Sequence, residues 1–230
     1  MTASIRARDI FIEFPIDKVD QHQDLEKEKL RPRKSSHIAL RAFDCDWTTG
    51  DRIGIRGPNG AGKTTLLKML AGVYKPTSGE LQVTGRIVSL TDLFMGFDSS
   101  ANAIQNLQLR GRLLGASPEF IAGVQDQICE FSELGEFLNL PLRMYSSGML
   151  MRLAFSVTAF MPFDILLMDE WLSVGDAAFN AKVESKLSEM VDSAKIFVLA
   201  SHATALLDRQ CNRQYEISGG NLVELQHINN

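Results

Sequence analysis

Hydrophobic and polar positions follow two different periods along this chain, and the changes between them predict an α/β fold. Residues 165–168 and 196–200 are apolar runs of strand length. Between them, residues 179–191 carry apolar side chains at helical spacing. A strand, a helix and a second strand in this order predict a parallel sheet, because parallel strands need a long crossover connection.

The first part of the chain alternates in the way that strands do. The pattern predicts strands at residues 5–14, 38–47, 52–55 and 81–90, with a helix at 63–72.

The rest of the pattern predicts surface segments and a final hairpin. The polar stretch 17–36 is dense in charged residues, which favours an exposed helical turn or loop. Residues 214–225 predict a hairpin that turns at Gly219 and Gly220.

Helical periodicity dominates the middle of the chain. Apolar side chains recur at helical spacing over residues 101–137, and a short amphipathic helix is predicted at 148–160. We therefore expect one domain over residues 1–230, with a helical subdomain at about 97–160 inserted in it.

Composition and charge exclude some classes of protein. The 230 residues are 45% hydrophobic, which is enough for a core, and the net charge of −4 argues against wholesale binding to nucleic acid. The longest apolar runs are far shorter than the roughly 20 residues that span a bilayer. Because no secretory signal is visible, we expect a cytoplasmic protein whose membrane role depends on a partner.

A glycine-rich segment lies between the strand at 52–55 and the helix at 63–72, and it fits the pattern G-x-x-x-x-G-K-[ST]. In this pattern, backbone N–H groups surround phosphates at a helix N-terminus, and Lys63 reaches the β and γ oxygens. Thr64 is suited to bind Mg²⁺, and Thr65 can contact an α-phosphate. The segment is formed by Gly57, Pro58, Asn59, Gly60, Ala61, Gly62, Lys63 and Thr64.

Two acids, Asp169 and Glu170, follow the apolar strand at 165–168. They are expected at the carboxyl edge of a parallel sheet, where ligands of such sheets bind. Asp169 is suited to hold Mg²⁺, directly or through water. Glu170 is our candidate general base, since hydrolysis needs a carboxylate that the metal does not occupy.

Three further strings carry a family resemblance. Residues 145–149 (YSSGM) precede a helix, 152–156 read RLAFS, and 168–179 read MDEWLSVGDAAF. With the phosphate loop before them and His202 after them, they resemble ABC-transporter nucleotide-binding subunits over almost the whole chain. More narrowly, they resemble the ATPases of bacterial O-antigen and capsule exporters.

The resemblance implies a P-loop NTPase core of the ABC-ATPase type, with a mostly parallel sheet, an N-terminal antiparallel β subdomain and an inserted α-helical subdomain. It also implies a homodimer in which one subunit completes the ATP site of the other. By this resemblance, Asp176 lies at the dimer interface and His202 is the switch histidine. The cap on the partner's γ-phosphate is formed by Ser146, Ser147, Gly148 and Met149. A helix N-terminus with a serine hydroxyl is a suitable anion site.

The same resemblance implies ATP-driven export of a cell-surface polysaccharide, with Mg²⁺ as the metal. The partners implied are two integral membrane permease subunits, through which the polysaccharide is mainly contacted, and the place implied is the cytoplasmic face of the inner membrane. Because the chain stops at Asn230, we expect the short form without a C-terminal carbohydrate-binding domain.

Two assignments depart from the common family pattern. The family's usual glutamine after an early strand is absent, and Asp92 is the candidate in its place as a Mg²⁺ contact. Phe14 is the candidate to stack on adenine, with Phe11 or His37 as alternatives and a core role for Phe14 equally open.

Three rival hypotheses remain at this point. The first is a soluble ABC ATPase not coupled to transport, the second an ABC exporter of another substrate. The third is a scaffold module that keeps ATP as a structural ligand.

Overall fold

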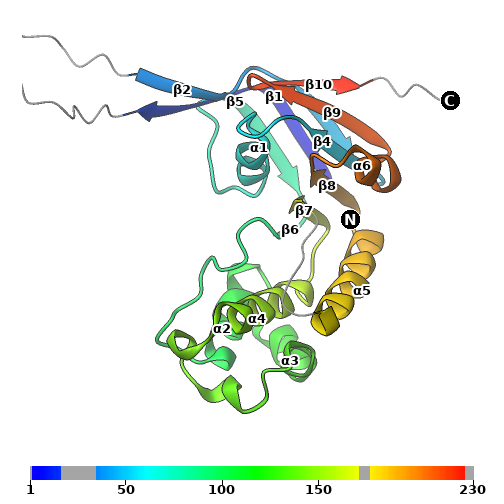
Figure 1. The fold of residues 1–230 in the computed structure, drawn as a ribbon. Helices are drawn as coiled ribbons and strands as arrows, with labels where there is room; N and C mark the ends of the chain where they lie inside the picture. The colour runs from blue at the N-terminus through cyan, green and yellow to red at the C-terminus, as the bar shows by residue number, and fades with distance from the viewer. Residues whose placement is uncertain (1, 17–34, 171–176, 226–230) are drawn as a thin grey trace, which may run out of the picture.

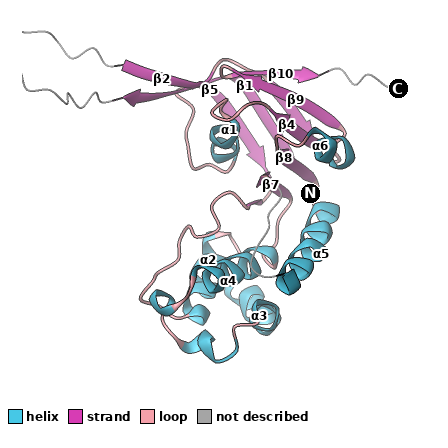
Figure 2. Ribbon diagram, viewed as in Figure 1, coloured by secondary structure: helices cyan, strands magenta, loops and turns pink. Residues whose placement is uncertain are grey.

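The protein has a β-rich part made of two sheets and a helical part beside it (Figure 1). A computed structural model describes residues 2–16, 35–170 and 177–225. Figure 2 shows the strands gathered on one side and helices α2, α3 and α4 on the other. The α/β class and the mostly parallel sheet predicted from sequence are confirmed.

The first sheet is antiparallel and is organised around one long strand. Strand β1 (Ser4–Ile16) pairs with β2 (Ser35–Leu40), β3 (Cys45–Thr48) and β5 (Ser78–Thr84). Its last residues pair with β2 and its first residues with β3. This sheet is the antiparallel β subdomain that the resemblance implied.

The prediction of one strand over residues 38–47 was wrong, because the chain bends between β2 and β3. At the bend, Phe43 O accepts a hydrogen bond from Ile10 N, and the Asp44 carboxylate accepts one from Asp9 N. Asp9 has a φ of 50°, so β1 is itself irregular at this point. Residues 35 and 36, expected in a loop, belong to β2; the rest of the stretch 17–36 lies outside the described residues.

The second sheet has six strands in the order β10-β9-β4-β8-β7-β6. Its neighbours are parallel except for the final hairpin, which turns at Gly219 and Gly220 as predicted. The strands are β4 (Arg52–Arg56), β6 (Ile87–Ser89), β7 (Ile165–Asp169), β8 (Ile196–Ala200), β9 (Arg213–Ser218) and β10 (Asn221–Leu225).

The single strand predicted over residues 81–90 is also two strands, one in each sheet. Gly85 has a φ of 117°, which few residues other than glycine adopt, and the Asp164 carboxylate binds the next backbone N–H, at Arg86. The chain therefore leaves the antiparallel sheet in β5 and enters the parallel sheet in β6.

Both faces of the parallel sheet are buried, which explains the continuous apolar runs in its central strands. Successive residues of a strand face opposite sides. In β7, Ile165 and Leu167 pack into the core shared with the antiparallel sheet and helix α1, whereas Leu166 and Met168 pack into the core shared with the helical part.

The helices begin and end close to the predicted positions, with one addition. The capping serine and asparagine side chains are Asn102, Ser117 and Ser146, as expected at helix N-termini. Helix α6 was not predicted, since it has only seven residues. The α-helices are α1 (Lys63–Leu70), α2 (Ala103–Leu113), α3 (Pro118–Ser132), α4 (Ser147–Ala159), α5 (Ala177–Ser193) and α6 (Thr204–Gln210), with 3-10 turns at Gly135–Asn139 and Leu142–Met144.

Within the described residues, no helix has the length and apolar character needed to cross a bilayer.

Candidate functional site

Three neighbouring strands of the parallel sheet deliver the candidate site residues to one edge. Strands β4, β8 and β7 are adjacent and parallel, so their carboxyl ends meet. The glycine loop follows β4, Ser201 and His202 follow β8, and Glu170 follows β7. Residues more than a hundred positions apart thus come together at the edge where ligands of such sheets bind.

The glycine loop fits only because two of its residues have no side chain. Gly57 has a φ of 155°, and a Cβ atom there would lie 2.3 Å from Ile217 O. Gly62 has a φ of 109°, and its Cβ would lie 2.6 Å from Ala39 O. The loop is therefore pressed against β2 and β9 while its backbone leads into helix α1.

The first residues of helix α1 place a cation and a hydroxyl beside Asp169. The Lys63 ammonium group donates to Gly57 O at 2.6 Å and to Pro58 O at 3.2 Å, and the residue is only 8% exposed. Thr64 Oγ1 donates to Asp169 Oδ2 at 2.5 Å. The hydroxyl and the carboxylate predicted to share a metal ion are thus in direct contact.

Glu170 is held in an unusual backbone conformation by a set of hydrogen bonds. Its φ is 65°, which costs a residue with a side chain about 1–2 kcal/mol. Ser201 Oγ donates to Oε2 at 2.6 Å, His202 N donates to Oε1 at 3.0 Å, and His202 Nδ1 lies 2.8 Å from Oε1. The surroundings thus fix the direction of the carboxylate.

The same contacts keep the Glu170 carboxylate ionised. Burial is the largest single influence and raises its pKa, but the hydrogen bonds from Ser201 and His202 together outweigh burial. The pKa of Glu170 therefore lies below its ordinary value. A carboxylate in this state can accept a proton or orient a water molecule at neutral pH.

A cleft of about 420 Å³ connects these groups with the N-terminal sheet. Phe14 and His37, which face each other across β1 and β2, form one wall, whereas Phe11 is not part of it. The Tyr74 ring meets the Phe14 ring edge-on, with centroids 5.2 Å apart. The cleft is lined by Phe14, His37, Ala39, Asn59, Gly60, Gly62, Lys63, Thr64, Thr65, Asp169 and Glu170.

The serine-glycine segment does not contribute to this cleft in the described part of the chain. Ser146 caps helix α4 by accepting a hydrogen bond from Met149 N at 3.3 Å, and both Ser146 and Ser147 are exposed. None of the four residues from Ser146 to Met149 lines the cleft. Asp176 lies outside the described residues.

Asp92 lies away from the cleft lining as well. Its carboxylate pairs with Lys68 of helix α1, at 3.1 Å, and it lines a separate hollow next to β6. This ion pair raises the pKa of Lys68, chiefly through the hydrogen bond to Asp92. The metal role predicted for Asp92 stays a prediction.

The sequence patterns missed two residues that shape the site. Ser201 is fully buried and holds Glu170, and Tyr74 supports Phe14. The only signal for Ser201 was its place immediately before His202 at the end of an apolar strand. Tyr74 carried no signal, because its contact with Phe14 joins the loop after helix α1 to the distant strand β1.

The donors at this edge fit a nucleotide polyphosphate with a divalent cation. Mg²⁺ usually takes one or two carboxylates together with substrate phosphates, and Thr64 and Asp169 provide one hydroxyl and one carboxylate. The glycine loop and Lys63 fit phosphates, and Glu170 fits the activation of water. Fold and site define an α/β ATPase of the phosphate-loop class.

Comparison with known sequences places the chain within this class. Residues 40–173, more than half of the chain, match the family model for the ABC transporter. The protein belongs to the ABC transporter family, whose ATP-binding cassettes bind and hydrolyse ATP.

Curated relatives within this family come from several bacteria. The chain is 42% identical over 193 residues to the O-antigen export system ATP-binding protein RfbB of Myxococcus xanthus, covering 84% of this chain but 44% of the relative. It is 40% identical to RfbE of Yersinia enterocolitica, another O-antigen export system ATP-binding protein, covering 81% and 78%. It is 33% identical to the teichoic acids export ATP-binding protein TagH of Staphylococcus haemolyticus, covering 97% and 84%. The chain thus spans less than half of the Myxococcus protein and most of the other two.

Solved structures share the fold at lower identity. A dimeric, post-hydrolysis structure of the ATP-binding cassette MJ0796, bound to ADP and Pi, superposes with a TM-score of 0.69 at 18% identity. It covers 97% of this chain and all of that one. This likeness confirms the ABC-ATPase fold.

Proposed function

We propose that this protein is the ATP-hydrolysing subunit of an ABC exporter that moves a cell-surface polysaccharide of the O-antigen or capsule type across the cytoplasmic membrane. ATP hydrolysis is supported chiefly by the Glu170 carboxylate, which is held ionised at the edge of the cleft beside the phosphate loop. The similarity to O-antigen export ATP-binding proteins supports the substrate class.

In this proposal, different residues of the cleft bind different parts of ATP. The N–H groups of the loop from Gly57 to Thr64 bind the β- and γ-phosphates, and Lys63 turns from the loop carbonyls to the phosphate oxygens. Thr65 contacts the α-phosphate. Thr64 and Asp169 would hold Mg²⁺, which would neutralise charge that develops on the transferred group.

Glu170 and His202 act on the attacking water. Glu170 accepts the hydrogen bond that orients the water toward the γ-phosphate, and His202 stays joined to Glu170 through Nδ1 and reaches the γ-phosphate from the end of β8. Ser201 is a positioning residue, since it contacts Glu170 and not the nucleotide.

The site is completed by a second copy of the chain. The exposed N-terminus of helix α4, with Ser146, Ser147, Gly148 and Met149, caps the γ-phosphate held in the partner's loop. Asp176 lies at the same interface. A single chain leaves the start of α4 outside its own cleft, which supports this sharing.

Phe14 stacks on adenine at the outer wall of the cleft. Both Phe14 and His37 line the cleft, but the Phe14 ring is the one braced edge-on by Tyr74. A flat apolar ring held in this way suits stacking on a base.

The cassette works as a homodimer beneath two integral membrane permease subunits, on the cytoplasmic face of the membrane. The permease docks on the apolar surface of the helical part between Gly96 and Leu140, at the hollow next to β6. It also provides the main contact with the polysaccharide. Asp92 lines this hollow, and in this proposal it links the permease to the Mg²⁺ of the nucleotide site. The net charge of −4 does not favour nucleic acid as a partner.

An exporter of teichoic acids is the second candidate, because TagH, a teichoic acids export ATP-binding protein, is among the relatives. A deletion strain that lacks this chain distinguishes the candidates, because the polymer that is no longer exported stays inside the cell. If the proposal holds, these cells lack surface polysaccharide and accumulate it inside. The wild-type gene restores surface polysaccharide, whereas the Glu170→Gln variant does not. Normal surface polysaccharide in the deletion strain would refute export by this subunit.

A further inference from the structure

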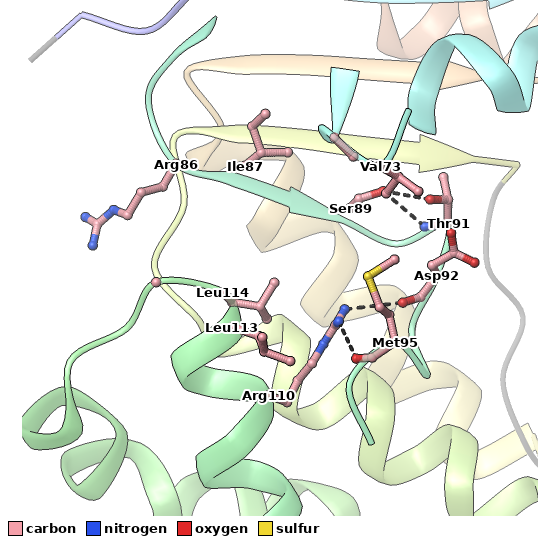
Figure 3. A pocket seen from close by; sticks show the side chains of 12 residues that line it. Val73, Arg86, Ile87, Ser89, Thr91, Asp92, Met95, Arg110, Leu113 and Leu114 are labelled. Atoms are coloured by element: carbon pink, nitrogen blue, oxygen red, sulfur yellow. Dashed lines mark hydrogen bonds between the residues drawn. The ribbon is translucent and has the colours of Figure 1, made fainter. Parts of the chain in front are cut away.

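A hollow of about 420 Å³ lies between the end of β6, the loop at residues 90–96 and helix α2 (Figure 3). Apolar side chains make most of its wall, and several are unusually open. Val73 is 42% exposed, Met95 46% and Leu113 65%. Exposed apolar side chains grouped around a hollow mark an interaction site. Ala71, Ile87 and Leu114 complete the apolar wall.

One member of this wall is a buried cation. Arg110 is only 4% exposed, and Figure 3 shows its guanidinium group reaching from α2 to the loop. Nη1 donates to Met95 O at 2.6 Å and Nη2 to Asp92 O at 3.3 Å, while Nε has no hydrogen-bond partner in the structure. All its acceptors are therefore neutral carbonyl groups.

Among the described residues, no carboxylate forms an ion pair with Arg110. Asp92, the acid whose charge acts on Arg110, offers its backbone carbonyl to Arg110 and its carboxylate to Lys68. Burial lowers the pKa of Arg110, and the charge of Asp92 offsets this only in part. A buried charge is costly unless it is paired, so Arg110 lacks the counter-charge that its burial calls for.

We propose that the permease segment that docks in this hollow carries an acidic side chain beside its apolar ones, and that this carboxylate pairs with Arg110. The inference rests on the docking stated under the proposed function and adds the chemistry of the partner. A purely apolar segment would bury Arg110 further without a counter-charge, and a basic one would be repelled. A carboxylate can form a charge-assisted hydrogen bond with the guanidinium group in dry surroundings.

Binding to everted membrane vesicles tests the pairing. Vesicles with the permease subunit and vesicles without it are mixed with the purified cassette, and the retained fraction is measured. Arg110→Glu is expected to weaken retention on permease vesicles at least about tenfold, the size of effect that opposing charges at a close contact give. Arg112→Glu is the matched control: it lies on the same helix, is exposed and does not line the hollow, and it should bind like the wild type.

A second experiment, a charge exchange, covers the case in which Arg110→Glu disturbs the loop at residues 90–96, to which Arg110 is hydrogen-bonded. Each cytoplasmic Asp or Glu of the permease is changed to Lys in turn, and one such change is expected to restore binding of Arg110→Glu. Wild-type binding by Arg110→Glu, or failure of every lysine to restore binding, would overturn the pairing.

A second variant separates this inference from the docking on which it rests. If Leu113→Asp abolishes retention while Arg110→Glu does not alter it, the hollow docks the permease through apolar contacts and the pairing is wrong. If the wild-type cassette binds permease vesicles no better than permease-free ones, the proposed docking itself fails.

Discussion

The side chains of Glu170 and His202 are joined at the edge of the parallel sheet, with Oε1 of the glutamate 2.8 Å from Nδ1 of the histidine. The same oxygen accepts the backbone N–H of His202 at 3.0 Å. Because Glu170 follows β7 and His202 follows β8, a small shift of one strand end against the other changes the direction of the carboxylate. The orientation of the candidate base therefore depends on how the two strand ends lie relative to each other.

Removal of the Ser201 hydroxyl should change the pH dependence of hydrolysis. The hydrogen bonds from Ser201 and His202 lower the pKa of Glu170 against the effect of burial, so the wild-type carboxylate stays ionised as the pH falls toward that lowered value. In Ser201→Ala, one donor is lost and the pKa of Glu170 rises. The acid limb of kcat against pH is expected to move to higher pH, as measured by phosphate release over the acid range. An unchanged acid limb would show that Glu170 does not control hydrolysis.

Replacement of Glu170 by Gln should separate binding from hydrolysis. The amide keeps the shape but cannot accept a proton, so we expect kcat to fall by roughly a hundredfold or more, the usual contribution of a general base. ATP binding is retained, and an ATP-bound dimer accumulates that size-exclusion chromatography detects. Turnover close to the wild-type rate would exclude Glu170 as the base.

The exposed start of helix α4 allows a test of the shared site. Ser147→Arg places a bulky cation where the partner's γ-phosphate is expected, while the cleft of its own chain is untouched. We expect nucleotide binding to one chain to change little and ATP-dependent dimerisation to be lost. Ser185→Arg, at an exposed position of helix α5, is the control and should dimerise normally. Equal loss of binding to the single chain in Ser147→Arg would contradict the shared site.

The close approach of the glycine loop to β9 predicts a steric effect. In Gly57→Ala, the new Cβ would lie 2.3 Å from Ile217 O, at a backbone conformation that alanine rarely adopts. We expect a loss of about 1–3 kcal/mol in the free energy of unfolding and a large loss of ATP affinity.

Gly123→Ala is the matched control for this change. Gly123 lies inside helix α3 with open space around its Cβ position, so alanine should stabilise the protein by up to about 1 kcal/mol. Thermal unfolding and nucleotide titration of the two variants check both expectations. A Gly57→Ala protein that matches Gly123→Ala would show that the loop is not constrained by Ile217.

The wall of the cleft predicts which aromatic residue binds the base. Phe14→Ala should weaken ATP binding by about tenfold, the value of one base–aromatic stack, whereas Phe11→Ala should not, since Phe11 does not line the cleft. Fluorescent-nucleotide titration of both variants measures the difference. A stronger effect of Phe11→Ala, or of His37→Ala, would move the stacking role to that residue.

Local patterns were enough to propose the chemistry of the site but not its surroundings. The residues from Gly57 to Thr64, and the acids Asp169 and Glu170, could be proposed from sequence because each set is contiguous and lies at a strand end. The strand predictions over residues 38–47 and 81–90 failed because alternation continues across a bend. Nothing in the period of an apolar pattern shows that Gly85 passes the chain from one sheet to the other.

The sequence by itself determined the class of this protein: a phosphate loop, a serine-glycine helix start and an acidic strand end follow one another in the order of an ABC cassette. Only the tertiary structure decided which distant groups meet. It set Ser201 and His202 against Glu170, chose Phe14 over Phe11 for the cleft, and left Arg110 buried beside an open apolar hollow. The physical reason is that spacing along the chain specifies local conformation, whereas contacts between residues far apart depend on how the sheets and helices pack.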